Sequence, residues 1–339
     1  MSENSCPVLC FGEVLLRVSA APGHPFASAD KVDLTVGGAE ANVAAALGQL
    51  GVPAKMVSTV PDNPLGNRAV RGLAASRVDV SGIARMPGRM GLYFYQPPVG
   101  SRAGEVIYDR AGSAFSNSDS CFYDFAGLLG SASLLHISGI TPALGPHGVT
   151  LVQAAAAAAR KAAVPVSLDG NFRASLWREW GGDPAAIMRE LAASATILFG
   201  NYKDIGMMLG EKFSSETEGD RAAAAQAAFD QFPGLKLIAS TQRTVHSASA
   251  HSISARIDTP EAHWESRPVL IEDVVDRIGT GDAFAAGVLM RWREDATLYA
   301  IGSAGLALSA LKHGQHGDML TISRSELERF DANAGDVAR

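Results

Sequence analysis

The stretch Asp276-Arg-Ile-Gly279-Thr280-Gly281-Asp282-Ala-Phe-Ala-Ala-Gly287 places a glycine-rich turn directly before a run of small and apolar residues. This run predicts a helix, and the first turn of a helix leaves backbone N–H groups without partners. Those groups and the helix dipole bind anions, and glycines let phosphate oxygens approach closely. Asp282 would lie beside the bound anion, where a hydroxyl nucleophile needs a proton acceptor. An ordinary aspartate cap after a glycine turn explains the same residues, so this stretch alone leaves both interpretations open.

On either side of this stretch, short apolar runs alternate with helical segments. The pattern predicts a mainly parallel sheet covered by helices on both faces, a three-layer α/β/α body. The predicted strands are 8–11, 55–59, 134–137, 164–168, 196–199 and 235–240. The predicted helices are 39–50, 65–76, 148–163, 184–194, 203–209 and 221–232.

Two pairs of apolar runs break the alternation, because no helix separates their members. The pairs are 14–18 with 32–36 and 91–96 with 105–108. They predict a small antiparallel β-flap, or lid, with strands within about 13–36 and 90–112. No linker divides the chain, so we expect one domain over 1–339. Exposed edge strands of such a lid can pair between two chains, which makes a homodimer through the lid a hypothesis.

Composition limits the class of protein. The chain has 339 residues, of which 47% are hydrophobic and 19% are charged, as is usual for globular proteins. A formal net charge of -6 argues against a nucleic-acid partner. No apolar run reaches membrane-spanning length, the first ten residues lack signal-peptide features, and Cys6, Cys10 and Cys121 form no disulfide or metal framework. We therefore expect a cytoplasmic protein with reduced thiols and no membrane contact.

A second glycine-led stretch, Gly37-Gly-Ala-Glu-Ala-Asn42-Val-Ala-Ala-Ala-Leu47, lies far upstream of the first. The two stretches resemble, in the right order, the N-terminal and C-terminal signatures of the ribokinase (PfkB) family of carbohydrate kinases. The resemblance implies a ribokinase-like fold with a lid. It also implies ATP- and Mg²⁺-dependent phosphoryl transfer to a sugar hydroxyl, with Asp282 as the catalytic base.

Several further motifs resemble the 2-dehydro-3-deoxygluconate kinases within that family. These enzymes phosphorylate the 6-hydroxyl of a six-carbon keto-acid sugar. The motifs are Phe11-Gly-Glu-Val-Leu-Leu-Arg17, Tyr108-Asp-Arg110-Ala-Gly-Ser113, Ser138-Gly-Ile-Thr-Pro-Ala143, Asp169-Gly-Asn171-Phe-Arg173 and Leu311-Lys-His313 with Gly317-Asp318.

The resemblance assigns residues to each part of the site. The catalytic residues are Asp282, Gly279, Thr280, Gly281 and Arg173. The acceptor site comprises Gly37, Gly38, Ala39, Glu40, Asn42, Tyr93, Tyr108, Arg110, Arg173, Asp282 and Asp318. The ATP site comprises Asn171, Asn201, Ser240, Thr241, Arg243, Gly279, Thr280, Gly281 and His313. Asn201 and Asp204 would hold magnesium indirectly.

Residue chemistry agrees with the acceptor assignment. A sugar acid carries a carboxylate, for which arginine offers a permanently charged, bidentate partner such as Arg110. Arg173 follows a predicted strand, and α/β folds bind ligands at the carboxyl ends of strands. A surface salt bridge for Arg173 and a place in the lid core for Tyr93 and Tyr108 are the structural alternatives.

The sequence departs from the family pattern at several positions. Arg277 and Thr280 replace the usual threonine and alanine of the second signature, but an anion site made of backbone groups tolerates both changes. Asp204 replaces the glutamate of the Asn-x-x-Glu motif and is one methylene shorter. Ser240-Thr-Gln-Arg243 stands where many relatives carry Lys-x-Gly, and its side chains can still donate to phosphates.

Two rival functions remain. A sister kinase such as a fructokinase would share Asp282 and the anion site but would not need Arg110. A catalytically silent sugar-binding protein on the same fold would have lost the base or the glycine turn, and this chain retains both.

Overall fold

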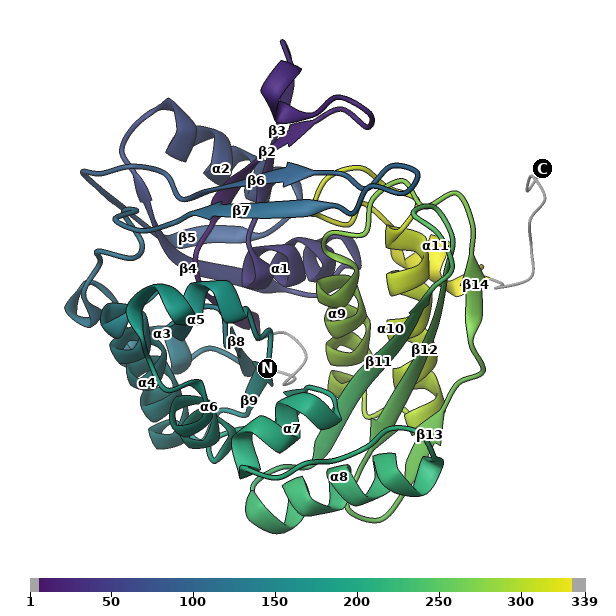
Figure 1. The fold of residues 1–339 in the computed structure, drawn as a ribbon. Coiled ribbons are helices and arrows are strands. Elements are labelled where there is room, and N and C mark those ends of the chain that lie inside the picture. The colour runs from purple at the N-terminus through teal and green to yellow at the C-terminus, as the bar shows by residue number, and fades with distance from the viewer. Residues whose placement is uncertain (1–5, 331–339) are drawn as a thin grey trace.

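The computed structural model describes residues 6–330. Its centre is a ten-stranded sheet in the order β13-β12-β11-β10-β9-β8-β1-β4-β5, with β14 paired to β12 (Figure 1). Neighbouring strands from β5 to β11 are parallel, and β12 is antiparallel to its three neighbours. The predicted α/β class with a mainly parallel sheet is confirmed.

The large sheet contains β1 (Val8–Phe11), β4 (Ala54–Pro61), β5 (Asp79–Met86), β8 (Leu134–Ser138), β9 (Val166–Asp169), β10 (Ile197–Phe199), β11 (Leu237–Val245), β12 (His251–Asp258), β13 (His263–Glu265) and β14 (Val269–Ile271). The helices are α1 (Ala39–Gln49), α2 (Pro64–Ala75), α3 (Phe125–Leu129), α4 (Pro146–Lys161), α5 (Ala174–Trp180), α6 (Pro184–Ala192), α7 (Tyr202–Leu209), α8 (Glu218–Gln231), α9 (Thr280–Arg293), α10 (Leu298–Lys312) and α11 (Arg324–Glu328). Short 3₁₀ turns lie at Phe26–Ser28, Ser120–Phe122 and Pro142–Leu144.

Helices cover both faces of the large sheet, and each face has its own hydrophobic core. Side chains alternate between the faces of a strand, so β1 contributes to both cores. Val8 and Cys10 pack with α1, α2, α9 and α10, whereas Leu9 and Phe11 pack with α3 to α8. This burial fixes the strand register, because a slip of one residue would exchange the two faces.

A separate small sheet has the order β3-β2-β6-β7 and comprises β2 (Leu15–Ala20), β3 (Val32–Gly37), β6 (Leu92–Gln96) and β7 (Glu105–Asp109). Figure 1 shows it above α1 and α9. The prediction of an antiparallel flap was wrong in one respect, because the central pair, β2 and β6, is parallel. β2 follows β1 and β6 follows β5, two strands of the same parallel sheet, so both segments enter the small sheet in the same direction.

The outer strands of the small sheet, β3 and β7, are edges that carry the exposed side chains Val32, Val106 and Ile107. The homodimer stays a prediction. Residues 1–5 and 331–339 of the expected single domain lie outside the described residues. Within residues 6–330, every helix is too short or too polar to cross a lipid bilayer.

The carboxyl ends of β8, β9 and β10 meet at one edge of the large sheet. Each strand is followed by a glycine whose N–H donates to a carbonyl of the next strand: Gly139 to Asp169 at 2.8 Å, Gly170 to Phe199 at 2.7 Å and Gly200 to Ala239 at 3.1 Å. These glycines keep the backbone in the sheet at the edge where α/β folds bind ligands.

Candidate active site

The glycine-rich turn ends at α9, as the sequence indicated. Gly279 precedes the helix with φ 80°, and a Cβ there would lie 2.1 Å from the carbonyl oxygen of Asp318. Glycine is therefore required at this position by both conformation and packing. Gly281 has no positive φ, and a Cβ there would meet no atom within 4 Å. With no side-chain cap on α9, the N–H groups of its first turn are free to bind an anion.

Asp282 lies in the first turn of α9 and is partly buried. Its Oδ2 accepts a hydrogen bond of 2.7 Å from Nδ2 of Asn42 on α1. Burial raises the pKa of Asp282 to about 7, against the lowering effects of the Asn42 hydrogen bond and the Arg173 charge, while Asp318 and Glu40 raise it further. A carboxyl with this pKa is suited to accept a proton near neutral pH.

The alternative of an ordinary aspartate cap is wrong for Asp282, because its carboxylate makes no capping hydrogen bond. The start of α8 shows the difference. Asp220 is the third residue of α8, as Asp282 is of α9, and Asp220 forms a capping box with Thr217. Burial and the bond to Asn42 therefore distinguish Asp282 from a cap at the same helical position.

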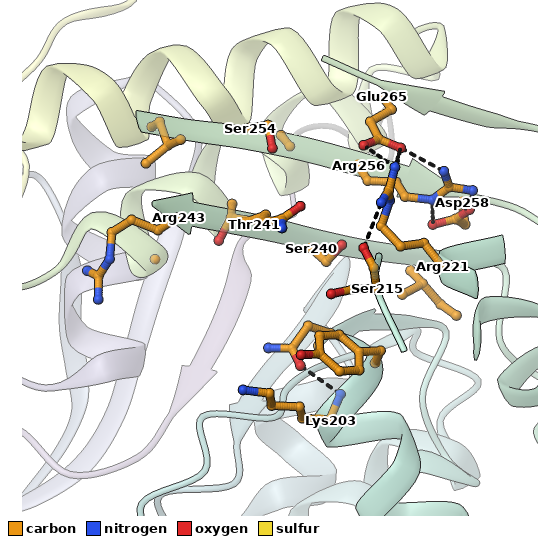
Figure 2. Close-up of a pocket in the computed structure, with 18 of the residues that line it drawn as sticks. Lys203, Ser215, Arg221, Ser240, Thr241, Arg243, Ser254, Arg256, Asp258 and Glu265 are labelled. Atoms are coloured by element: carbon orange, nitrogen blue, oxygen red, sulfur yellow. Dashed lines mark hydrogen bonds and ion pairs between the residues drawn. The ribbon is translucent and has the colours of Figure 1, made fainter. Parts of the chain in front are cut away.

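A cavity of about 700 Å³ opens beside the start of α9, with walls from α7, α8, α10, β11 and β12. Asn171, at φ 39°, and Gly279 are outside its lining although both were assigned to ATP. The other residues assigned to ATP all line the cavity, together with Arg173: Asn201, Ser240, Thr241, Arg243, Thr280, Gly281 and His313. Figure 2 shows Ser240, Thr241 and Arg243 along β11, facing Lys203 across the cavity.

Unpaired cations line this cavity in a protein whose net charge is negative. Among residues 6–330, Arg173, Lys203 and Arg243 have no carboxylate within ion-pair distance. By contrast, Arg221 and Arg256 are both held by Glu265 at 2.9 Å (Figure 2). Three cations without a carboxylate partner suit a polyanion such as a nucleoside triphosphate. Sequence reasoning missed Lys203, although it lies inside the Asn201-Tyr-Lys-Asp204 motif.

The carboxyl groups of Asp204 and Asp282 influence that of Asp169 at the sheet edge. Burial raises the pKa of Asp169 to about 8, and the charges of Asp282 and Asp204 add to the rise, opposed by Arg173. Burial also raises the pKa of Asp204, whose Oδ2 accepts from the N–H of Asn201 at 2.8 Å. Sequence reasoning gave Asp169 no role.

These carboxyls fit a magnesium ion held through water. Burial is the largest cause of the raised pKa values of Asp169 and Asp204, and a divalent cation would favour the ionised forms of both. In the described part of the chain, no three acidic or imidazole side chains converge into a cage of protein ligands. Magnesium commonly keeps several of its waters, so Asn201 and Asp204 fit the indirect role expected of them.

The Gly37-Gly38 pair approaches its neighbours too closely for any side chain. A Cβ would lie 2.1 Å from Oδ2 of Asp318 at Gly37, and 2.3 Å from the carbonyl oxygen of Glu13 at Gly38, where φ is 132°. Glu40 was assigned to the acceptor site, but it is only 1% exposed and its Oε1 accepts from Ser138 at 2.6 Å. Its carboxyl group therefore supports the start of α1 from inside the protein.

The small sheet brings Tyr93 and Tyr108 together, with ring centroids 6.4 Å apart. Nε of Arg110 donates to Oε2 of Glu13 at 2.6 Å, and both side chains are buried. The two terminal nitrogens of Arg110 have no hydrogen-bond partner in residues 6–330. Glu13 thus orients the guanidinium and leaves its bidentate edge unused. Glu13 was missed because it lies far from Arg110 in the sequence.

Comparisons with known proteins agree with this geometry. Residues 7–324 match the pfkB family of carbohydrate kinases. The crystal structure of 2-dehydro-3-deoxygluconokinase from Thermotoga maritima superposes with a TM-score of 0.90 at 33% identity, covering 96% of this chain and 97% of that one. A 2-dehydro-3-deoxygalactonokinase of Haloferax volcanii is 28% identical over 95% of both chains. A fructokinase of Rhizobium leguminosarum bv. trifolii is also 28% identical, over 95% of this chain and 90% of that protein.

The family match covers the glycine-rich turn and the first turn of α9, residues 279–282, which we call the phosphate cradle. It also covers the small sheet. A catalytically silent relative would be expected to lack the glycine turn or Asp282, and this chain has both. The chain therefore belongs to the pfkB family of carbohydrate kinases and is an ATP-dependent sugar kinase.

Proposed function

We propose that this kinase transfers the γ-phosphoryl group of ATP to the 6-hydroxyl of 2-dehydro-3-deoxygluconate, giving the 6-phosphate and ADP. The observation that carries the choice of a sugar acid is Arg110, whose Nε is held by Glu13 while its terminal nitrogens are unpaired. An acid buried beneath the small sheet needs such a partner, because an unpaired buried charge is costly. The relatives that act on 2-dehydro-3-deoxy sugar acids support the same class.

Asp282 acts as the general base. Asn42 holds Oδ2, so Oδ1 is left to accept the proton of the acceptor hydroxyl. As the acceptor oxygen bonds to the γ-phosphorus, the bond from that phosphorus to the bridging oxygen breaks, and ADP leaves with the electron pair. Because burial holds the pKa of Asp282 near 7, the carboxylate is a stronger base than a solvated aspartate.

The start of α9 and the unpaired cations bind the phosphates. Backbone N–H groups of Thr280 and Gly281 point to the charge that develops on the phosphoryl group, as in other preorganised anion sites. Arg173 lies close enough to Asp282 to lower its pKa, so it is placed near the transferred group. Magnesium, held through water by Asn201 and Asp204, would neutralise phosphate charge. The small sheet excludes water, which otherwise competes as acceptor.

Asn42 sets the pH dependence of this reaction. Its hydrogen bond stabilises the ionised form of Asp282, so Asn42→Ala raises the pKa of the base above its present value of about 7. The acid limb of kcat/KM then moves to higher pH by about one unit, the worth of a hydrogen bond to a charged group. Rate measurements from pH 5.5 to 9.5 test this, and activity should recover at the alkaline end. An unmoved acid limb contradicts the assignment of Asp282 as the titrating base.

Arg110→Ala should raise KM for 2-dehydro-3-deoxygluconate by about 10- to 100-fold, the cost of losing a charged hydrogen bond. KM for ATP should hardly change, since Arg110 is outside the lining of the cavity. Arg110→Lys, which keeps the charge for Glu13 but not the planar fork, should show an intermediate KM. Arg89→Ala is the matched control, because Arg89 pairs with Asp109 beside the small sheet and is partly exposed. Equal KM values in Arg110→Ala and Arg89→Ala would exclude the carboxylate-binding role.

A coupled ADP-release assay tests the substrate directly. The panel comprises 2-dehydro-3-deoxygluconate, its galactonate epimer, fructose and ribose, and the measured quantity is kcat/KM for each. We expect the two sugar acids to exceed the neutral sugars by at least about tenfold, a modest value for one charged contact. If kcat/KM for a neutral sugar exceeds that for the sugar acids by the same margin, the substrate proposal is wrong and the protein is a sister kinase. The fructokinase relative makes this the principal alternative.

A further inference from the structure

A buried ionic cluster joins the small sheet to the body. Arg17 of β2 is only 4% exposed. Its Nη2 donates to Oδ2 of Asp276 at 2.6 Å, its Nη1 to Oδ1 of Asp318 at 3.1 Å and its Nε to Oγ of Ser19 at 2.5 Å. The guanidinium also lies over the ring of Tyr95, 4.9 Å from its centroid. Nothing in the phosphoryl transfer described above uses Arg17, yet each of its three guanidinium nitrogens donates a hydrogen bond.

The two carboxylates that Arg17 joins flank the phosphate cradle. Oδ1 of Asp276 accepts from the N–H of Ile278 at 3.0 Å, which shapes the turn that leads to Gly279. The carbonyl oxygen of Asp318 is the atom against which Gly279 packs. One side chain from the small sheet therefore fixes both segments that contact the cradle.

Asp318 also faces the acceptor side. Its Oδ2 accepts from the hydroxyl of Tyr93 at 2.5 Å, and it lies against Gly37. The charged and titratable groups around it are Arg17 and Tyr93 from the small sheet, and Asp276, Lys312 and Asp282 from the body. Lys312 is fully buried, and its Nζ donates to the carbonyl oxygen of Gln315 at 3.0 Å.

The ionisation of Asp318 depends on these neighbours. Burial raises its pKa to about 6, and the charge of Arg17 is the largest influence that opposes the rise, followed by the Tyr93 hydrogen bond. Without Arg17, the pKa of Asp318 would rise further. A protonated Asp318 would keep one oxygen occupied by its own proton and could accept fewer hydrogen bonds from the acceptor.

We propose that Arg17 is a positioning residue that keeps Asp318 ionised and oriented, with Tyr93, to bind an acceptor hydroxyl, and so couples the small sheet to the phosphate cradle. The inference rests on the proposed function only in taking Asp318 and Tyr93 as acceptor-site residues. It does not depend on which sugar is the acceptor.

The test uses Arg17→Met, Asp318→Asn and the double variant, each assayed with the best acceptor of the wild type. We expect Arg17→Met to raise acceptor KM by about 10- to 100-fold, as for a lost charged interaction, with KM for ATP changed by less than about threefold. The acid limb of kcat/KM for the acceptor, which Asp282 sets in the wild type, should become steeper and move up as the pKa of Asp318 rises to overlap that of Asp282, because loss of an opposite charge raises the pKa of a carboxyl by about one unit or more. In the Asp318→Asn background, Arg17→Met should add no further shift.

Tyr93→Phe serves as a second variant in case Arg17→Met does not fold. It removes only the hydroxyl that donates to Asp318, so the acid limb should move in the same direction. Arg17→Lys keeps a positive charge near Asp318, so the acid limb of its kcat/KM profile should lie close to the wild-type pH.

If Arg17 only stabilises the fold, Arg17→Met should have a lower melting temperature but an unchanged acceptor KM and an unchanged acid limb. That result overturns the proposal. A shift that persists in the Asp318→Asn background overturns it as well. If no sugar acid is phosphorylated but a neutral sugar is, the substrate proposal fails, and the same measurements on that sugar still decide the role of Arg17.

Discussion

Asp282→Asn should lower kcat by about 100-fold or more, the contribution typical of a general base, while KM for acceptor and for ATP changes little. The amide is nearly the same size as the carboxylate and can still pair with Asn42, so the fold should survive. What is lost is an oxygen basic enough to take the proton of the acceptor hydroxyl. Steady-state ADP release at saturating substrates measures the change, and the melting temperature verifies the fold.

Asp220→Asn is the matched control. Asp220 is the third residue of α8 as Asp282 is of α9, but it caps its helix at a partly exposed position outside the cavity lining. Asp220→Asn should cost some helix stability and leave kcat unchanged. Near-normal kcat in folded Asp282→Asn would remove Asp282 from the role of base.

Gly281→Val should lower kcat/KM for ATP by about 100-fold or more, comparable to losing donors of an anion site. The added side chain finds no protein atom within 4 Å of its Cβ, and Gly281 lines the cavity. The substitution therefore fills space that the phosphates need without straining the backbone. Activity should fall while the melting temperature stays near that of the wild type.

Gly219→Val provides the comparison for a glycine at the second position of a helix. It is the second residue of α8, where a Cβ would meet only Oγ1 of Thr217 at 3.7 Å, and it should leave turnover unchanged. Gly279→Ala should behave differently from both, because its φ of 80° and the Asp318 carbonyl oxygen make it destabilising as well as inactivating. Wild-type turnover in Gly281→Val would mean that the phosphates bind elsewhere.

Much of the parallel sheet could be predicted because its strands are short apolar runs between helices. β1 was predicted at its observed bounds, Val8–Phe11. β12 was missed for a physical reason: its Arg256 and Asp258 are buried, but they satisfy each other at 2.7 Å, and hydrophobic patterning treats charged residues as exposed. β5 was missed because it is a mostly half-exposed edge strand interrupted by Gly82.

Candidate site residues that lie together in one continuous motif could be predicted from the sequence. Contacts between residues from distant segments could not. The residues Gly279 to Asp282 are contiguous, so together with the upstream signature the sequence predicts an anion site and a base there. The hydrogen bond from Asn42 to Asp282 and the pair of Glu13 with Arg110 join segments far apart in the chain, so only the folded structure reveals them. Lys203 was overlooked because the motif around it directs attention to Asn201 and Asp204.

The parallel pairing of β2 with β6 has a consequence for how the molecule folds. Leu16 pairs with Leu92, and the intervening chain contributes α1, β4, α2 and β5 to the body. Because a parallel pair cannot form as a local hairpin, the small sheet has high contact order and must await docking of these elements. A chain in which α1, β4, α2 and β5 are not yet in place therefore also lacks the central strand pair of the sheet that lies above α1 and α9.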